Sequence, residues 1–344
     1  MRSFLTFSEE RRRIVCEQAQ DRLGLPPATI EKDFWVCWTL KKLFELPEWG
    51  EQVTFKGGTS LSKGWSLIKR FSEDIDIVIN RSALGFGDDR SPDRAPSRKQ
   101  LNKRLDDLKE ASQHCVNNIL LPLLREAVSQ EMPPDLPWQL NPSPYDPDGQ
   151  TLLLRYPTAF AGQMVYLGQE VKIELGARSD TDPTQDIVIH PYIAEAFPDL
   201  FPQSSFRVKA VSPERTFWEK AMLLHEETFR RPDKKRQARM ARHYYDLYYL
   251  IDAGVGQKAS QDLDLFKRIA AHRQVYFRQN WVDYDTLRPG SLMLVPSEEQ
   301  LADWRSDYAA MKDEMFFDKP PAFDELIARV REFQEGFNKN VYNR

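Results

Sequence analysis

Two short stretches decide the fold of this chain: residues 55–60, which read FKGGTS, and residues 74–79, which read DIDIVI. Apolar and acidic residues alternate in the second stretch, and this alternation predicts a β-strand in which residues i and i+2 point to the same face. Asp74 and Asp76 are therefore expected to project together, while the isoleucines face the core. Because two carboxylates on one strand face repel each other unless a cation lies between them, and oxygen ligands suit Mg²⁺, the pair predicts a metal site.

The glycine pair at residues 57–58 predicts a phosphate-binding turn. Glycines just before a helix let a phosphate approach the backbone N–H groups at the helix start. We predict a short strand over residues 53–56, and after the glycines a helix over residues 59–69 that is capped by Thr59 or Ser60. A strand, glycine turn, helix and second strand in this order are how an α/β nucleotide-handling core begins.

The composition is that of an ordinary globular protein. The chain has 344 residues, of which 29% are charged and 41% hydrophobic, and its net charge is −4. This length predicts two lobes, and the negative balance means that any basic surface must be local. Three widely spaced cysteines fit a reducing cytoplasm and have no metal-ligand spacing. Because the sequence has no signal-peptide core and no apolar run near 18 residues, we expect a cytoplasmic protein that does not span a membrane.

Helix and strand patterns along the chain predict an α+β fold, and the family resemblance described below implies that its core is a mixed β-sheet flanked by helices. Further helices are expected over residues 8–23, 26–46, 97–130, 212–229 and 243–252, and further strands over residues 151–156, 163–167, 169–175, 185–190 and 206–210. Residues 81–96 and 131–150 are rich in loop-forming residues, so residues 81–150 are interpreted as an inserted helical and loop segment. We divide the chain into a core domain, residues 1–210, and a mainly helical C-terminal domain, residues 211–344.

The expected helix over residues 26–46 carries three consecutive charged residues. Its apolar positions nearly encircle it, which predicts a well-buried helix. Glu31, Lys32 and Asp33 are then expected on whatever polar edge remains. A simple first-turn charge cluster is the favoured interpretation, and a role in ordering an active-site loop is the alternative.

Nucleotidyl transfer with two metal ions about 3.5–4 Å apart usually takes three carboxylates. Two come from residues 74–79, so the third must come from a neighbouring strand. Glu174 is the best candidate, because residues 171–175 (VKIEL) alternate in phase, and it would also take the proton from the attacking hydroxyl. Lys63 is a candidate phosphate contact, and Ser72 is expected on the same side as the paired aspartates.

With these motifs in view, the chain resembles the AbiEii/AbiGii toxin family of nucleotidyltransferases, in the DNA-polymerase-β-like superfamily. Members of that family act as toxins of type IV toxin–antitoxin or phage abortive-infection systems. The resemblance spans roughly residues 25–255; its central motif is specific, and the later motifs are looser. It rests on residues 30–35 (IEKDFW), 55–63 (FKGGTSLSK), 70–76 (RFSEDID), 172–174 (KIE), 219–220 (EK) and 242–247 (RHYYDL).

The resemblance implies a nucleotidyltransferase-like sheet core with a helical C-terminal lobe, and it assigns roles to the matching residues. Asp74 and Asp76 would bind Mg²⁺ or Mn²⁺ together with Glu174, which stands where Asp is more usual. Lys220 would contact the triphosphate of an NTP substrate, and Asp246 would be a late catalytic-site aspartate. The full set assigned to nucleotide binding is Lys56, Gly57, Gly58, Thr59, Ser60, Lys63 and Ser72.

The surroundings of Asp246 support part of this assignment. Asp246 lies among tyrosines and leucines, and an acid in such a setting needs a partner, which Lys220 or Arg242 would provide. A purely structural ion pair is the alternative. His243 stands where many relatives of the family carry Asp.

A basic run at residues 230–242 predicts a surface for RNA phosphates, because it holds seven Lys/Arg in thirteen residues. A solvated segment between loop and helix is the alternative. The residues assigned to RNA binding are Arg230, Arg231, Lys234, Lys235, Arg236, Arg239 and Arg242.

Three functions fit these observations. The first is Mg²⁺-dependent transfer of NMP from an NTP to an RNA end, with the tRNA 3′ end favoured as acceptor, by a monomeric toxin that an antitoxin from an adjacent gene restrains. The second is nucleotidyl transfer to a protein or to a small molecule such as an aminoglycoside, which would not need the basic run. The third is an inactive nucleotide-binding module, against which the three metal-type carboxylates argue.

Overall fold

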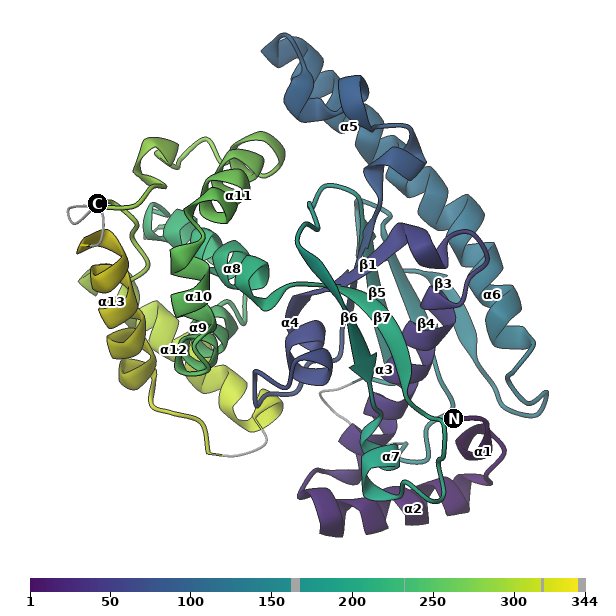
Figure 1. Ribbon diagram of the computed structural model, residues 1–344. Helices are drawn as coiled ribbons and strands as arrows, with labels where there is room; N and C mark the ends of the chain where they lie inside the picture. The colour runs from purple at the N-terminus through teal and green to yellow at the C-terminus, as the bar shows by residue number, and fades with distance from the viewer. Residues whose placement is uncertain (162–167, 232, 317–318, 340–344) are drawn as a thin grey trace. The chain divides into compact units, whose positions relative to one another are not determined.

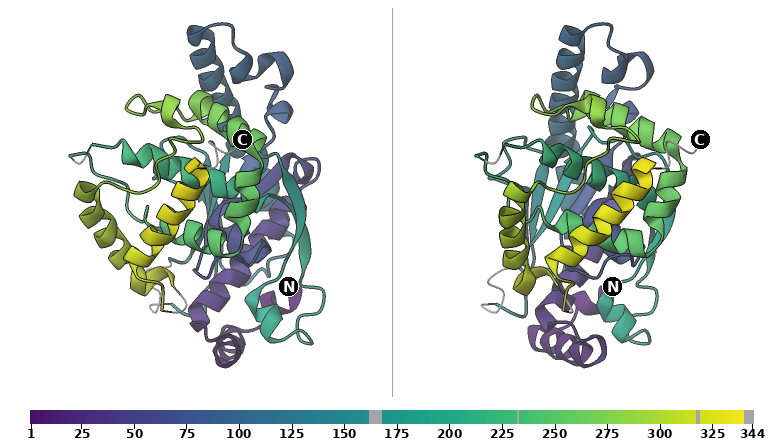
Figure 2. Two further views of the ribbon diagram at one scale, coloured as in Figure 1. Left: turned by 60° about the vertical axis from the view of Figure 1, so that its left-hand side comes forward. Right: turned by 90° about the vertical axis from the view of Figure 1, so that its left-hand side faces the viewer.

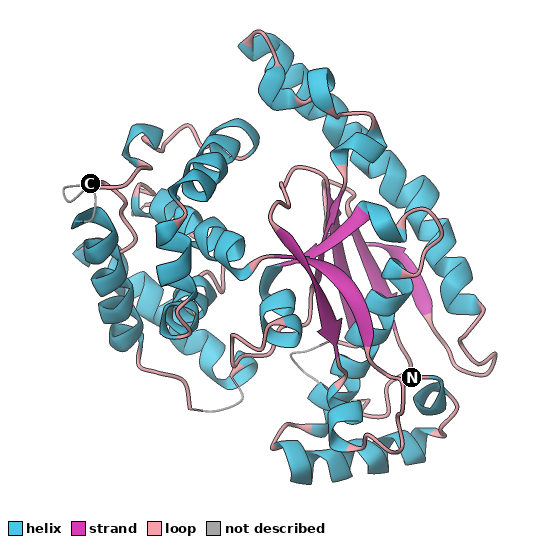
Figure 3. Ribbon diagram, in the orientation of Figure 1, coloured by secondary structure: helices cyan, strands magenta, loops and turns pink. Residues whose placement is uncertain are grey.

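The computed structural model describes four ranges of the chain: residues 1–161, 168–231, 233–316 and 319–339 (Figure 1). For residues 312–314 it describes the backbone but not the side chains. The chain forms two compact units, of which the first comprises residues 1–64 and 72–211, and the second residues 65–71 and 212–344. Among the described residues, every strand of the sheet belongs to the first unit, whereas the second consists of helices and loops (Figure 3).

The first unit is built on a seven-stranded sheet with the strand order β3-β4-β5-β2-β1-β7-β6. The β1–β7 and β2–β5 pairs are parallel and the remaining pairs are antiparallel, which confirms the predicted α+β fold with a mixed sheet. The strands are β1 (Val53–Lys56), β2 (Ile75–Ile79), β3 (Gln139–Pro142), β4 (Thr151–Arg155), β5 (Glu170–Gly176), β6 (Thr184–Ile189) and β7 (Phe206–Val211).

The register of the three central strands brings charged residues side by side. Asp76 of β2 is opposite Lys56 of β1 on one side and opposite Glu174 of β5 on the other. The alternation predicted for β2 is present, since Ile75 and Ile77 are buried and Asp76 between them is partly open to solvent. The alternating sequence therefore places a carboxylate row on one face of the sheet and apolar side chains on the other.

Helices pack around this sheet. Helix α3 (Pro27–Phe44) lies across one face and contacts β5 and β7, and Figures 1 and 2 show α5 extending past the ends of the strands. A π-helical segment, Val116–Leu120, joins α5 to α6 and makes one nearly continuous helix of the predicted range 97–130. The other helices of this unit are α1 (Arg2–Leu5), α2 (Glu9–Leu23), α4 (Gly57–Thr59), α5 (Arg98–Cys115), α6 (Leu121–Ser129) and α7 (Tyr192–Ala196).

Two local predictions were wrong, and one lies outside the described residues. The helix after the glycines starts at Gly57, continues as the π-helical segment Ser60–Gly64 and ends there, because residues 65–71 belong to the second unit. Its N-cap is Lys56 without a side-chain hydrogen bond, so neither predicted hydroxyl caps it. Within the predicted irregular segment, β3 forms because Leu140 is buried at the edge of the sheet. The predicted strand over residues 163–167 falls on residues that the structure does not describe.

The second unit packs its helices around aromatic side chains. Helix α8 starts as predicted, with the Ser212 hydroxyl accepting a hydrogen bond from the Arg215 backbone N–H and with proline in the first turn. Trp218 packs against Phe266 and Phe337 in its core. No helix in the described part of the chain is long and apolar enough to cross a membrane. The helices are α8 (Pro213–Thr228), α9 (Arg242–Asp252), α10 (Val255–Gln261), α11 (Leu263–Tyr276), α12 (Glu298–Met315) and α13 (Phe323–Lys339).

Candidate active site

The glycine turn lies directly against the carboxylate of Asp76. Gly57 has a φ of 80°, a conformation that residues with a Cβ rarely adopt. A Cβ placed on Gly57 would lie 1.8 Å from Oδ2 of Asp76. Glycine is therefore required at this position for two reasons, the backbone conformation and the close approach of the turn to the acidic strand.

The two hydroxyl side chains that follow the glycines make hydrogen bonds that stabilise the turn. Thr59 and Ser60 are buried, and the Ser60 hydroxyl donates to the Gly57 carbonyl oxygen over 2.9 Å. The Thr59 hydroxyl lies 2.5 Å from the carbonyl oxygen of Asp74 and 2.9 Å from the hydroxyl of Ser72. These contacts join the turn to the start of β2. Since no side chain caps this helix start, its first backbone N–H groups are the part of the turn suited to bind a phosphate.

Asp74, Asp76 and Glu174 form a group of interacting carboxylates. Burial and the negative charges of Glu174 and Asp74 raise the pKa of Asp76 to about 7, although Lys56 opposes the shift. Asp76 also shares a side-chain hydrogen bond with Glu174. The Lys172 ammonium contacts the other side of this group by bonding to Glu174. Burial and the neighbouring carboxylates therefore both disfavour the charged form of Asp76.

The donor chemistry of this group fits a divalent cation, whereas the side-chain positions do not yet converge. Among the residues that the structure describes, no three His, Cys, Asp or Glu side chains are arranged to hold a metal ion as they stand. Asp76 and Glu174 are direct neighbours across two strands, which places their backbones about 5 Å apart, and Asp74 is two residues from Asp76. The three carboxylates are thus neighbours, and carboxylate oxygens are the ligands that a hard cation such as Mg²⁺ prefers.

The three charged residues of α3 are buried, contrary to the expectation that they occupy a polar edge. At most 2% of Glu31, Lys32 and Asp33 is exposed. They are buried because each finds a partner outside its helix, which a buried charge requires. The alternative interpretation, that they order loops near the active site, is the one that these partners support.

Asp33 holds the segment that follows the glycine turn. Its carboxylate lies 3.0 Å from Nζ of Lys63, which is also 3.8 Å from Glu195 and stacks 3.4 Å from the ring centroid of Tyr192. The Lys63 side chain is 4% exposed. In this structure Lys63 therefore anchors the π-helical segment to α3, and its ammonium is already engaged by protein groups.

Lys32 and Glu31 tie α3 to two further loops. Lys32 pairs with Glu73, the residue just before the acidic strand begins. Glu31 accepts hydrogen bonds from the hydroxyl of Thr158, at 2.6 Å, and from the backbone N–H of Ala159, at 2.9 Å. Helix α3 therefore contacts both the residue before Asp74 and the segment that follows the glycine turn.

The second unit contains a separate buried group of charges around Asp246. Arg70 holds the Asp246 carboxylate with two nitrogens, at 2.7 and 2.8 Å, and Nζ of Lys220 lies 2.9 Å from it. Burial alone would raise the pKa of Asp246, but the two cations hold that pKa well below its usual value. Burial lowers the pKa of Lys220 in spite of the neighbouring carboxylate.

Of the two partners predicted for Asp246, the structure shows only Lys220. Arg242 instead donates to the Arg239 carbonyl oxygen over 3.3 Å. Arg70, which sequence reasoning did not pair with Asp246, takes that place from 176 residues away. Burial and the charge of Lys220 lower the pKa of His243, and its Nδ1 has no hydrogen-bond partner among the described residues.

Acidic neighbours neutralise part of the basic run at residues 230–242. Arg230 and Arg236 both pair with Glu227, at 2.7 and 3.2 Å, and the next arginine in the run pairs with an aspartate two residues further on. Lys234 and Lys235 are exposed. The run therefore presents fewer available cations than its sequence indicates, and the two lysines are the ones most open to a partner.

Comparisons with known proteins identify the family and a similar fold. The family model described as "Nucleotidyl transferase AbiEii toxin, Type IV TA system" matches residues 38–329. Among solved structures, the fold is similar to that of MenT4, a nucleotidyltransferase toxin from Mycobacterium tuberculosis H37Rv, with a TM-score of 0.50 and 18% sequence identity over 94% of this chain and 88% of that one. No match was found among the curated proteins.

Proposed function

This chain belongs to the AbiEii family of nucleotidyltransferase toxins of type IV toxin–antitoxin systems, and from this premise we propose that it transfers NMP from an NTP to an RNA acceptor in a Mg²⁺-dependent reaction. The tRNA 3′ end is the acceptor that we favour. Family membership also implies an NTP substrate and an antitoxin partner. In this proposal the protein acts in the cytoplasm as a monomer, and its antitoxin comes from an adjacent gene.

The contact between the glycine turn and Asp76 is the observation that carries the proposal. Phosphate-binding backbone and metal-binding carboxylates must be adjacent for a metal ion to bridge an NTP and the protein, and Gly57 touches the Asp76 carboxylate. The raised pKa of Asp76 is consistent with the same conclusion, because burial and then the negative charges of Glu174 and Asp74 disfavour a second carboxylate charge that a bound cation would offset.

In this proposal the glycine turn and the three carboxylates of the first unit have defined roles. The backbone of Gly57 and Gly58 binds NTP phosphate oxygens, and Asp74, Asp76 and Glu174 would hold Mg²⁺ or Mn²⁺. The bound cation would supply Lewis-acid neutralisation of the phosphate charge. Glu174 accepts the proton of the attacking RNA hydroxyl, for which its partly exposed carboxylate is accessible.

The roles of the remaining predicted residues are supported to different degrees. Lys234 and Lys235, which are exposed, are the strongest candidates to bind RNA phosphates. Lys220 and Asp246 keep the triphosphate and catalytic roles that the family resemblance implies, although each is engaged by protein partners in this structure. Lys63 has the weakest support as a phosphate ligand, because Asp33 holds its ammonium.

The decisive experiment incubates the purified protein with each labelled NTP, Mg²⁺ and total tRNA, and resolves the labelled products on a denaturing gel. We expect label on the RNA, lost on omission of the metal and reduced at least about 10³-fold in the Asp74→Asn/Asp76→Asn double variant. The matched control is Asp106→Asn/Asp107→Asn, which removes the same charge from α5, outside the proposed site.

Two results would contradict the proposal in different ways. Transfer that survives in the double variant would exclude the acidic strand as the catalytic site. Label on protein or on a small molecule, with none on RNA, would keep the nucleotidyltransferase and replace the acceptor. A growth assay on expression of the same variants gives an independent readout of toxicity.

A further inference from the structure

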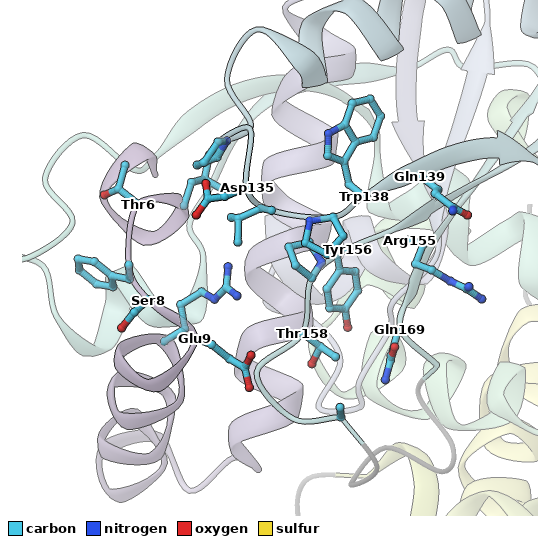
Figure 4. Close-up of a pocket in the computed structure, with 18 residues that line it drawn as sticks. Thr6, Ser8, Glu9, Asp135, Trp138, Gln139, Arg155, Tyr156, Thr158 and Gln169 are labelled. Atoms are coloured by element: carbon cyan, nitrogen blue, oxygen red, sulfur yellow. The ribbon is translucent and has the colours of Figure 1, made fainter.

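A pocket lies in the first unit, between the N-terminal helices and the segments that flank β3 and β4. It has a volume of about 920 Å³, within the usual range for ligand sites. Figure 4 shows Thr6, Ser8 and Glu9 on one side of it and Trp138 and Tyr156 on the opposite side. None of the residues assigned to catalysis, nucleotide binding or RNA binding lines this pocket.

The pocket is remote from the acidic cluster along the sheet. Arg155 at its rim is opposite Glu170 at the start of β5, whereas Glu174 is opposite Thr151 at the other end of the same ladder. Four residues of strand correspond to about 13 Å. A ligand in the pocket would therefore not touch the catalytic carboxylates.

A buried arginine with two unsatisfied nitrogens lines the pocket. Arg12 is only 2% exposed, and its Nε and Nη1 have no hydrogen-bond partner among the described residues. Buried guanidinium groups are almost always paired, because an unsatisfied buried charge is costly. Burial lowers the pKa of Arg12, although the negative charges of nearby carboxylates oppose the shift.

Three carboxylates act on Arg12 from a distance, those of Glu9, Glu31 and Asp135, and the first two are engaged by other groups. Glu9 pairs with Arg13 at 3.1 Å. Glu31 is held by Thr158 and Ala159, and burial raises its pKa, so its negative charge is itself disfavoured. No carboxylate of the described residues lies within ion-pair distance of Arg12. The guanidinium is thus available to an acceptor that enters the pocket.

The rest of the lining suits a compact apolar body. Leu5, Leu136, Trp138 and three prolines form the apolar part of the walls, and polar side chains, among them Glu9 and Asp135, form the rest. The hydroxyl of Tyr156 is also buried and has no hydrogen-bond partner among the described residues. The buried cation and the buried hydroxyl provide a polar anchor, and the apolar part of the walls provides a contact for the rest of a ligand.

We propose that this pocket binds a small organic anion, whose carboxylate or phosphate accepts hydrogen bonds from Arg12 and Tyr156 and whose apolar body lies against Trp138 and Leu136. The site is separate from the active site, and the proposal does not depend on the acceptor of nucleotidyl transfer. Carboxylate and phosphate share the required chemistry, so the test compares them directly.

Isothermal titration calorimetry of the full chain tests this proposal with three probes that share a phenylalkyl group and differ in their polar end. They are 3-phenylpropionate, phenethyl phosphate and the neutral 3-phenylpropanamide. We expect at least one anion to bind once per chain with a Kd below about 1 mM, as suits ligands of this size. The amide should bind at least tenfold more weakly. Arg12→Gln should weaken the anion at least tenfold, and Arg98→Gln, which removes an exposed arginine of α5, should leave its affinity unchanged.

Tyr156→Phe and Thr6→Trp keep the test decisive if Arg12→Gln does not fold. The first removes only the buried hydroxyl and should weaken the anion several-fold, and the second fills the mouth of the pocket from an exposed position and should abolish binding. Absence of binding by both anions, equal binding of the amide, or unchanged binding in the folded variants would each overturn the proposal. A preference for the phosphate probe would identify phosphate esters as the ligand class, and the reverse preference would identify carboxylates.

Discussion

At the scale of single residues, the candidate site depends on Gly57 and Asp76 being in contact. Either residue alone is a common feature of proteins: a glycine in a turn and an aspartate on a strand. Their contact is specific, because the turn approaches the carboxylate more closely than any residue with a Cβ allows. The two residues can therefore be tested as a pair.

Gly57→Ala should destabilise the fold and impair transfer together. The added methyl meets the Asp76 carboxylate and forces a strained φ, so we expect the free energy of unfolding to fall by about 3 kcal/mol. Gly24→Ala is the control, because Gly24 also has a positive φ, of 69°, but nothing lies within 4 Å of its Cβ position. In that control the free energy of unfolding, measured by urea denaturation, should fall by only about 1 kcal/mol. Equal losses in the two variants would mean that the close contact is unimportant.

The raised pKa of Asp76 predicts a pH-dependent metal affinity. Since the pKa is about 7, a cation must displace a proton below that pH, and Mg²⁺ affinity measured by thermal shift should rise close to tenfold per pH unit up to about pH 7 and then level off. In the metal-free protein, the contribution of Asp76 to folding stability changes with pH in the opposite direction. The stabilisation that the proton provides is complete below the usual pKa of 3.8 and is lost as pH rises through about 7. Asp76→Asn should abolish both dependences, and a flat affinity profile in the unsubstituted protein would refute this explanation.

At the scale of elements, helix α3 contacts three of the segments that form the candidate site. Three consecutive charged residues at its start reach the π-helical segment, the loop before β2 and the loop after β4. The helix is buried among sheet and helices, so its ion pairs are shielded from solvent. This arrangement gives a structural account of a motif that the sequence left open between two interpretations.

Lys63→Met distinguishes an anchoring lysine from a phosphate-binding one. Removing one partner of a buried pair leaves Asp33 unpaired, so we expect a loss of about 3–5 kcal/mol in unfolding free energy and a loss of transfer. Adding Asp33→Asn removes the unpaired charge, and the amide still accepts from the backbone N–H of Tyr192, now 2.7 Å from the Asp33 carboxylate. The double variant should therefore recover stability and activity together. Recovery of stability without activity would instead assign Lys63 to the phosphate.

At the scale of the whole molecule, the balance of charge limits where RNA can bind. A net charge of −4 gives no general attraction to nucleic acid, so binding depends on local cations. Much of the basic run is paired internally, which leaves the exposed Lys234 and Lys235 as the main candidates.

Lys234→Gln/Lys235→Gln should weaken RNA binding in a salt-dependent way. If both lysines contact phosphates, the slope of log K against log salt for single-stranded RNA should fall by about 1.4, as measured by fluorescence anisotropy. Arg98→Gln/Lys99→Gln removes two exposed charges from α5 and should leave the slope unchanged. An identical slope in both variants would place the RNA surface elsewhere.

Much of the fold was predictable because its signals are local. Alternation identified β2 and β5, and the Ser-Pro start identified α8, since side-chain direction in a strand and capping at a helix start depend on neighbours in the sequence. The short edge strand β3 was missed because its proline-rich surroundings outweigh a single buried leucine. The end of the helix after the glycines was missed because it depends on which unit the next residues join.

By itself, the sequence determined the glycine turn, the paired aspartates, the mixed sheet and the family to which the chain belongs. Only the tertiary structure decided that Glu174 is the neighbour of Asp76, that Asp33 and Lys63 pair beneath the turn, and that Arg70 and not Arg242 holds Asp246. The reason is physical. A residue's secondary structure follows from side chains a few positions away, whereas the partner of a buried charge is set by strand order and helix packing, which join residues as far apart as 70 and 246.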